Sequence, residues 1–204
     1  SGCLTMSLLL LLNGNNGGAA PPAPTYATWN TADKAAAITI SNNDLTAASS
    51  GGWWGARATI GVTDGDWFFE QVIDVADNAS TYTGVGVCTS SQGLTFPGDN
   101  SGNGWGIISH GYNTNPGGVS SNGVSLSPGD VVGVSILRST SRAKFYKLVA
   151  GSWSLVYNAD ISSVDGQAIY PMFATLGGQG TANFGPAPFA DSVPDGANEG
   201  VYTV

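Results

Sequence analysis

The chain has 204 residues, of which only 10% are charged, and its net charge is −8. Six Lys and Arg residues are too few for the basic surface that nucleic-acid binding requires, and they also argue against attraction to anionic membranes. Strong helix formers are scarce, whereas glycine is abundant at 30 residues and hydrophobic residues make up 42%. This composition indicates an all-β domain with a sizeable core and many short strands joined by tight turns.

Residues 1–24 differ from the rest of the chain. An apolar run is followed by the flexible segment Asn13–Gly18 and the Pro/Ala linker Ala19–Pro24. The run is too short to span a bilayer, and no Lys or Arg precedes it as in a signal peptide. Because exposed leucines favour aggregation, we expect residues 1–24 to form an extended arm that anchors the chain to a partner. The anchoring residues would be Leu8, Leu9, Leu10, Leu11 and Leu12.

Residues 25–204 are predicted to form a single β domain around the segment Gly65–Val75. In an extended strand, alternate side chains point to opposite faces. One face would carry the largely apolar set, which is Trp67, Phe69, Gln71, Ile73 and Val75. The other face would be mixed and half-buried, with Phe68, Glu70, Val72 and Asp74. A strand this aromatic needs a second layer to cover it, which predicts a two-sheet antiparallel β-sandwich.

Other strands are predicted where β-branched or aromatic residues alternate with polar ones. In chain order they cover 25–29, 36–41, 45–47, 57–62, 82–88, 105–109, 131–137, 143–149, 153–157, 169–174 and 181–185. Pro171 predicts that its strand is an edge or bulged strand. Ser49–Gly55 and Tyr112–Asn122 are predicted as loops, and Pro186–Pro194 is expected to pack onto the body of the domain.

The order of several motifs resembles the SPRY domain. The motifs are Trp67-Phe68-Phe69-Glu70, Tyr82 to Val87, Gly104-Trp105-Gly106, Gly129 to Val134, Phe145-Tyr146-Lys147, Tyr170-Pro171, Asn183-Phe184-Gly185 and Pro188-Phe189. Each motif is weak alone, but the ordered set is specific and covers about residues 53–196. The resemblance implies a bent two-sheet sandwich of the concanavalin A-like jelly-roll class. The family's Asn-Gly turn after Phe-Tyr-Lys is replaced by Leu148 to Gly151, and its peptide-binding loops are not recognisable.

The segment Thr25–Leu45, running into Arg57–Gly61, resembles SPRY-like proteins of tailed bacteriophages, as does the short apolar segment Met6–Leu12. This resemblance implies a structural protein at the virion surface. Its partners would be other virion proteins of the capsid or tail, together with copies of the chain itself.

A catalytic site is not indicated. Glu70 and Asp74 would lie about 13 Å apart along one strand, too far for the paired carboxylates of a glycosidase. His110 has no candidate nucleophile near it in the sequence, and it is expected to be an ordinary loop residue.

A metal site is not indicated either. Asp99–Gly104 matches half of a calcium loop, but position 12 is His110 instead of Glu. Cys88 is expected to be a buried free thiol, although a bond with Cys3 is an alternative. We expect no metal and no cofactor.

Glycan binding is the main alternative. Aromatic rings stack on sugars while Asn side chains bond their hydroxyl groups, and the candidates are Trp53, Trp54, Tyr112, Asn113 and Asn115. Adjacent Trp53 and Trp54 cannot both point into a core, whereas Trp105 is expected to be a core residue.

Four functions are weighed on the sequence. The first is a non-enzymatic phage structural protein, as a capsid decoration, head fibre or tail component. The second is a lectin-like adhesion module for host-surface glycans, and the third is a concanavalin A-like glycosidase. The fourth is a cellular SPRY adaptor, against which the apolar N-terminal segment and the low charge argue.

Overall fold

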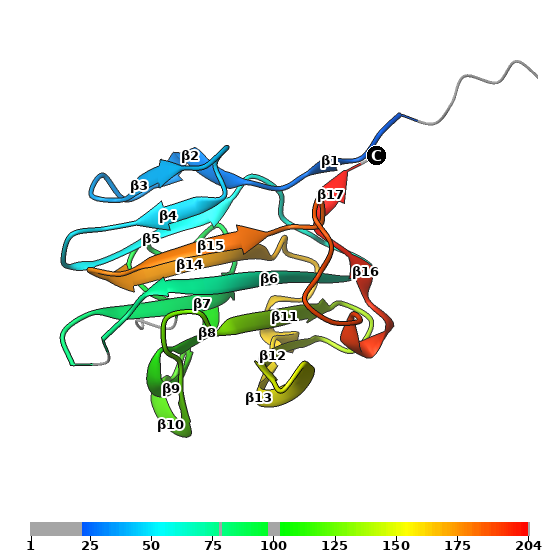
Figure 1. Cartoon of the computed structure of the whole chain (residues 1–204). Helices are drawn as coiled ribbons and strands as arrows, with labels where there is room; N and C mark the ends of the chain where they lie inside the picture. Colours follow the sequence, from blue (N-terminus) through cyan, green and yellow to red (C-terminus); the bar gives the residue numbers. More distant parts are fainter. Residues whose placement is uncertain (1–21, 78, 98–102, 204) are drawn as a thin grey trace, which may run out of the picture.

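Two β-sheets pack face to face to form the body of the protein (Figure 1). The structure is a computed structural model and describes residues 22–77, 79–97 and 103–203. All pairings within the two sheets are antiparallel, except that one short C-terminal strand joins the second sheet in parallel. The all-β, two-sheet sandwich predicted from the sequence is confirmed.

The first sheet has seven strands in the order β10-β9-β8-β7-β14-β5-β2. Their bounds, in that order, are Gly118–Ser125, His110–Asn115, Gly104–Ile108, Tyr82–Cys88, Tyr170–Leu176, Trp53–Ala58 and Trp29–Lys34.

The second sheet follows the order β13-β12-β11-β6-β15-β4-β3, and β16 pairs with β6 beside this path. The bounds in that order are Ser152–Asp160, Arg142–Val149, Val131–Leu137, Asp66–Val75, Gln179–Asn183, Thr46–Ala48 and Thr39–Ser41, with Asn198–Glu199 for β16. We call this sheet the eight-stranded sheet.

The two ends of the described chain pair with each other. β1 (Thr25–Tyr26) and β17 (Tyr202–Thr203) form a separate two-stranded sheet. Two 3₁₀ turns complete the fold, η1 at Ser162–Val164 and η2 at Pro194–Gly196. The described residues contain no helix long and apolar enough to cross a membrane.

The core lies between the sheets and is centred on β6. Phe69 and Ile73 point into it and are fully buried, as their alternation along the strand predicts. Phe69 meets Phe184 with ring centroids 5.7 Å apart, and Phe184 meets Trp29 at 5.1 Å. The indole nitrogen of Trp29 donates to the backbone oxygen of Leu45 at 2.8 Å. Burying each such large side chain contributes about 1.5–3 kcal/mol, so this face of β6 is a principal source of stability.

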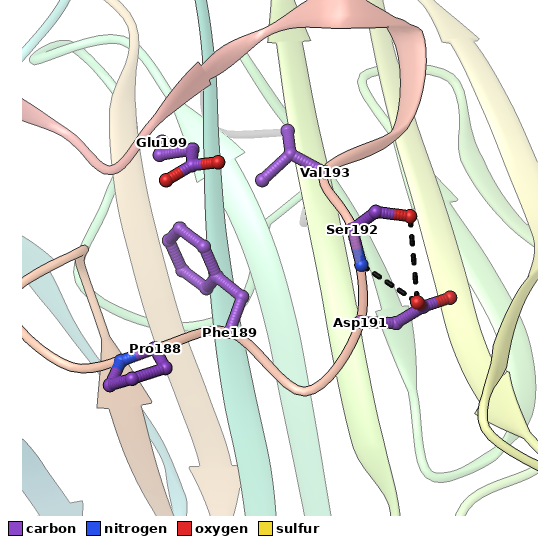
Figure 2. Close-up of a pocket in the computed structure, with 6 residues that line it drawn as sticks. All are labelled: Pro188, Phe189, Asp191, Ser192, Val193 and Glu199. Carbon is purple, nitrogen blue, oxygen red and sulfur yellow. Dashed lines mark hydrogen bonds between the residues drawn. The ribbon is translucent and has the colours of Figure 1, made fainter.

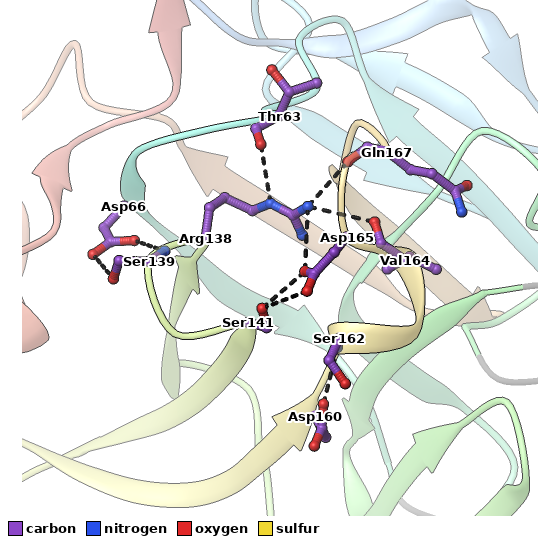
Figure 3. Close-up of polar contacts among 10 residues, drawn as sticks. All are labelled: Thr63, Asp66, Arg138, Ser139, Ser141, Asp160, Ser162, Val164, Asp165 and Gln167. Carbon is purple, nitrogen blue, oxygen red and sulfur yellow. Dashed lines mark hydrogen bonds and ion pairs between the residues drawn. The ribbon is translucent and has the colours of Figure 1, made fainter.

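Arg138 fastens several segments at one end of the sandwich (Figure 3). Its side chain is 5% exposed and lies 3.8 Å from the carboxylate of Asp165. The guanidinium also donates to three backbone oxygens, those of Thr63 (3.3 Å), Val164 (3.4 Å) and Gln167 (3.4 Å). The arginine therefore ties the turn around η1 to the loop that leads into β6.

The outer face of β6 is covered by residues 186–199, which we call the C-terminal strap. Phe189 packs edge-on against the fully buried Phe68, with centroids 5.0 Å apart. The backbone N–H of Ala190 donates to Oε2 of Glu70 at 3.1 Å. Glu70 is consequently only 7% exposed, so it is more buried than the half-buried face predicted from the sequence. A segment more than 100 residues away in sequence turns this face into a second, smaller core.

The strap is also fastened through Asp195. The Lys144 ammonium lies 2.6 Å from one oxygen of this carboxylate, and the hydroxyl of Tyr146 donates to the other. Although burial alone would raise the pKa of Asp195, the bonds from Lys144 and Tyr146 outweigh it and hold the pKa below its usual value. Burial and the bond to Asp195 raise the pKa of Tyr146, so its phenol stays protonated.

Two segments predicted as loops lie partly in strands: Ser49–Gly55 in its last three residues, and Tyr112–Asn122 in all but the turn at 116–117. Trp53 and Trp54 begin β5, which starts four residues before the strand predicted at 57–62. Residues 112–122 lie in the hairpin of β9 and β10, which are rich in Gly, Ser and Asn. Asn, Gly and Ser usually favour turns, and here pairing with the rest of the sheet overrides that preference.

Pro171 does not lie in an edge strand. Its strand, β14, is central in the seven-stranded sheet and pairs with both β7 and β5. Pro171 is the second residue of β14, and the ladder with β5 begins only at Met172. The missing amide hydrogen therefore breaks no pairing on that side.

Several predictions concern residues outside the described part of the chain. These are the anchoring leucines 8–12, Cys3 and most of the half calcium loop at 99–104. Cys88 is described, and it is a buried free thiol as expected. Burial raises the pKa of Cys88 to about 12, which keeps this thiol protonated and poorly nucleophilic.

Candidate binding surface

The outer face of the seven-stranded sheet carries neighbouring large side chains at one end. Leu176 of β14 is in register with Trp53 of β5 on one side and with Tyr82 of β7 on the other. Alternation places these three residues on the face opposite Ala56 and Val85, which lie in the core. Trp53 and Tyr82 therefore meet above Leu176, with nearly parallel rings 5.9 Å apart and 11° between their planes.

Further rings extend this pair in both directions. Phe96 lies 5.0 Å from Trp53, His110 lies 4.1 Å from Tyr82, and Tyr112 lies 4.6 Å from His110. We call these five side chains the aromatic row. Each aromatic pair contributes about 0.5–1.5 kcal/mol beyond the area it buries, so the row is held together by its own contacts.

Tyr82 is positioned by the loop that precedes β7. Its hydroxyl donates to the backbone oxygen of Ala79 at 2.9 Å. That loop is ordered by Asp77, whose Oδ1 accepts backbone N–H bonds from Ser80 (2.8 Å), Ala79 (2.9 Å) and Thr81 (2.7 Å). These bonds hold the pKa of Asp77 well below its usual range, so the carboxylate stays charged and the loop stays closed around it.

Phe96 is positioned by an ion pair at the base of its loop, between the buried Arg57 and the partly exposed Asp33. Arg57 contacts Asp33 through two hydrogen bonds, of 2.7 Å from Nε and 2.8 Å from Nη2. Nη1 of Arg57 donates to the backbone oxygen of Gln92 at 2.5 Å. The backbone N–H of Gly55 also donates to the oxygen of Leu94 at 2.9 Å. The loop is thereby fixed against β5 just before Phe96.

His110 links the two tyrosines of the row. Burial lowers the pKa of His110, so its ring is neutral near pH 7. Its Nδ1 is buried and has no hydrogen-bond partner among the described residues. The expectation that His110 is an ordinary loop residue is wrong, because the residue begins β9 and its ring packs between Tyr82 and Tyr112.

The structure brings together only some of the residues that the sequence suggested for glycan binding. Trp53 and Tyr112 both belong to the aromatic row, and Tyr112 is 38% exposed. Trp54 is also exposed, but alternation along β5 directs it to the opposite face. Asn113 and Asn115 likewise alternate with Tyr112 along β9.

The two asparagines have structural hydrogen bonds of their own. Oδ1 of Asn113 accepts from Nδ2 of Asn122 at 2.9 Å, across the β9–β10 hairpin. Oδ1 of Asn115 accepts from the backbone N–H of Gly117 at 2.8 Å, within the hairpin turn. They shape the hairpin that presents Tyr112.

Tyr82, His110 and Phe96 were not among the suggested residues. In the segment Tyr82-Thr-Gly-Val-Gly-Val-Cys, alternation places Tyr82 on the same face as Gly84 and Gly86. The valines lie on the other face, which is the one expected to point into the core, so the ring of Tyr82 is expected on the outer face. That signal could have identified Tyr82. The contacts of His110 and Phe96 depend on the strand register and on the loop 89–97, which no local pattern specifies.

Glu70 and Asp74, the carboxylates considered for a glycosidase, serve the framework. Oε1 of Glu70 accepts from Nδ2 of Asn183 at 3.1 Å, in addition to the bond from the strap. Oδ2 of Asp74 accepts from the hydroxyl of Thr181 at 2.6 Å and from Nε2 of Gln179 at 3.3 Å. Both carboxylates thus tie β6 to β15. Among the described residues, no three His, Cys, Asp or Glu side chains are grouped so that they could hold a metal ion.

No family model and no curated protein sequence matches the chain. Solved structures do match. Stonustoxin aligns with a TM-score of 0.62 at 17% identity, over 78% of this chain and 27% of the stonustoxin chain. The chain therefore matches only about a quarter of the length of that protein.

Two isolated domains match over nearly their whole length. The PSpry domain of TRIM65 aligns with a TM-score of 0.60 at 14% identity, over 78% of this chain and 90% of the domain. The SPRY domain of human HERC1 aligns with a TM-score of 0.56 at 16% identity, over 76% of this chain and 96% of the domain. With this likeness, the two sheets and the order of motifs along them, the chain has the fold of a SPRY domain.

Proposed function

We propose that this chain is a non-enzymatic structural protein of a tailed-phage virion. Residues 1–24 anchor it to other virion proteins of the capsid or tail, or to copies of itself, and the SPRY-fold sandwich is displayed at the virion surface. The observation that carries this proposal is the position of the chain ends. Thr25 and Tyr26 pair with Thr203 and Tyr202 at one corner of the sandwich, so the chain leaves the domain at a single place. The β9–β10 hairpin lies toward the opposite end (Figure 1).

Such a geometry suits display. A partner that holds residues 1–24 engages the corner formed by β1 and β17 and leaves the aromatic row accessible. The role of the acidic side chains of β6 in the framework also favours a structural protein over an enzyme. The low content of charged residues, 10%, is compatible with dense packing among other subunits.

The anchor is tested by replacing the five leucines 8–12 with serine in the full chain. Particles assembled without the protein are incubated with each variant, and bound protein is measured after sedimentation. We expect the wild type to bind and the serine variant to remain soluble, because serine removes the apolar area that drives docking. A matched control replaces Asn13, Asn15 and Asn16 with serine and should bind like the wild type. Equal binding by all three proteins, or by none, would contradict the proposal.

Glycan binding is the second candidate, and the aromatic row is the observation that favours it. The row gathers five rings at one end of an outer face, and its accessible end lies at Tyr112, where exposed ring surface can stack on a sugar unit. We expect a host-surface polysaccharide to bind the full chain, and Trp53→Ala to weaken binding by about 3- to 10-fold through loss of one stacking contact.

Trp54→Ala is the matched control for that experiment. It removes the same type of side chain from the neighbouring position but on the opposite face of β5, so affinity should not change. Isothermal titration with polysaccharides selected from a glycan array provides the measurement. If Trp54→Ala weakens binding as much as Trp53→Ala, the aromatic row is not the glycan site.

A further inference from the structure

A hollow of about 360 Å³ lies within the C-terminal strap, between residues 188–193 and β16 at its end (Figure 2). Its lining consists of Pro188, Phe189, Asp191, Ser192, Val193 and Glu199. Figure 2 shows the ring of Phe189 below Glu199 and Val193, with Asp191 to one side. We call this hollow the strap pocket. It lies at the outer face of the eight-stranded sheet, whereas the aromatic row belongs to the other sheet.

Both walls of the strap pocket are fixed to β6. Phe189 rests edge-on against Phe68, so its ring is held from beneath. On the other side, β16 pairs in parallel with β6, which places Glu199 opposite Phe68. The backbone N–H of Gly200 donates to the oxygen of Phe68 at 3.1 Å. The pocket is therefore a built feature in which one strand positions both the aromatic ring and the carboxylate.

The carboxylates of the pocket have no cationic partner within the chain. Oδ1 of Asp191 accepts the backbone N–H of Ser192 at 2.7 Å, and no ion pair is formed by Asp191 or Glu199 among the described residues. Glu199 is exposed at the mouth of the pocket, so a ligand can reach it.

The basic residues of the chain are all engaged elsewhere. There are only six Lys and Arg residues, and all six lie in the described ranges. Five form ion pairs with aspartates outside the pocket, namely Arg57, Arg138, Arg142, Lys144 and Lys147. The sixth, Lys34, donates to the backbone oxygen of Ile38 at 2.7 Å. A side-chain cation for the strap pocket must therefore come from another molecule.

We infer that the strap pocket binds an arginine side chain presented by a partner protein. A guanidinium is planar, so it can stack on the ring of Phe189 while its paired N–H groups meet the Glu199 carboxylate. Pro188 and Val193 offer apolar surface to the aliphatic part of the side chain. Asp191 adds negative potential on the other side. This inference depends on the pocket alone and does not depend on the proposed virion role.

The probe for the test is N-acetyl-arginine methylamide, with N-acetyl-citrulline methylamide as the uncharged analogue of equal shape. Each is titrated into the ¹⁵N-labelled full chain, and the amide resonances of residues 188–199 are followed. We expect saturable shifts with the arginine compound only, and these shifts should diminish as salt is raised, because the attraction is partly screened. Equal shifts with citrulline would overturn the inference, since they would show that the charge plays no part.

The same titration is repeated with the variant Glu199→Gln. This substitution keeps the size of the side chain at an exposed position, so it should not disturb folding. Binding of the arginine compound should weaken by about 3- to 10-fold, as expected for one partly exposed ion pair with a stacked ring. The matched control is Asp44→Asn, which removes one negative charge in the turn between β3 and β4. Asp44 has a φ of 62°, a conformation that asparagine readily adopts. If both variants bind alike, the pocket does not recognise the guanidinium.

Discussion

The two sheets of the sandwich have contrasting outer faces. The eight-stranded sheet is covered by the C-terminal strap, so that Phe68 and Glu70 are as buried as core residues. The seven-stranded sheet is covered over part of its width by the loop 89–97, and the aromatic row at its end stays half-exposed. One face is therefore a second core, whereas the other retains accessible ring surface.

This difference suggests that the covered face mainly contributes to stability, whereas the open face is available for binding. On the covered face, apolar and polar contacts reinforce one another, and the strap pocket is the accessible feature left at its edge. On the open face, the aromatic rings are ordered by their neighbours but still present area that a ligand can bury. Substitutions on the two faces should therefore divide into those that unfold the protein and those that alter binding.

The largest effect is expected from Phe68→Ala. This side chain is fully buried between Phe189 and Trp153, and a Cβ at Gly133 would lie only 2.7 Å from its ring. Its loss would leave a cavity under the strap and should lower the free energy of unfolding by about 3–5 kcal/mol. The free energy of unfolding can be measured by urea titration, with tryptophan fluorescence as the signal. A loss below about 1 kcal/mol, as at ordinary surface positions, would show that the covered face is not a second core.

Tyr146→Phe should have the next largest effect. The change keeps the ring but removes the hydroxyl that donates to Asp195. Loss of a hydrogen bond to a charged group should cost about 1.5–3 kcal/mol. Amide hydrogen exchange in the strap should also become faster, because Asp195 then keeps its ion pair with Lys144 but loses its hydrogen bond from Tyr146. Tyr157→Phe is a suitable control, since Tyr157 lies on the core side of the same sheet. If exchange in the strap is unchanged by Tyr146→Phe, this bond does not fasten it.

The contrast between the two outer faces also explains which parts of the fold could be predicted from the sequence and which could not. Alternation along β6 correctly placed Phe69 and Ile73 in the core, because period-two patterning is a local property of strands. The same pattern left Phe68 and Glu70 as a half-buried face, because their cover is provided by residues 186–199. Packing of Pro186–Pro194 onto the body was predicted, but not the face that it covers.

The aromatic row shows the same limit. Trp53 and Tyr112 could be singled out as rings outside the expected core, but the link between them is made by Tyr82 and His110. That link requires β7 to lie between β14 and β8, with a definite register on each side. Strand order and register are set by the whole sheet, so single-segment patterns could not supply them.

Trp53→Ala tests how much the aromatic row of the open face contributes to stability. Trp53 is half-buried and contacts Tyr82 and Phe96, so its removal should cost about 1–2 kcal/mol, less than the removal of Phe68. Thermal unfolding by calorimetry provides the measurement, alongside the glycan titration described above. A loss as large as that of Phe68→Ala would mean that the open face is also a core.

The strap should show a pH dependence of its own. Because the pKa of Asp195 is lowered in the folded protein, its ionised form stabilises the fold at neutral pH. That contribution is fully present above the unfolded pKa of about 3.9 and is lost as the pH falls through the lower folded pKa. The difference in unfolding free energy between the wild type and Asp195→Asn should therefore shrink below about pH 4. A difference that stays constant from pH 7 to the acid limit would contradict this assignment.

Tyr112→Ala should have the smallest effect on stability and a clear effect on binding. The ring is 38% exposed and contacts only His110 within the aromatic row, so its removal should cost about 0.5–1 kcal/mol. Val119→Ala is the control, because Val119 is also exposed and lies in the partner strand of the same hairpin. If the aromatic row binds glycans, Tyr112→Ala reduces affinity and Val119→Ala does not, while both proteins unfold at nearly the wild-type temperature. If Tyr112→Ala instead destabilises the chain as much as Trp53→Ala, the exposed end of the row is part of the framework, and the strap pocket is then the recognition surface to test.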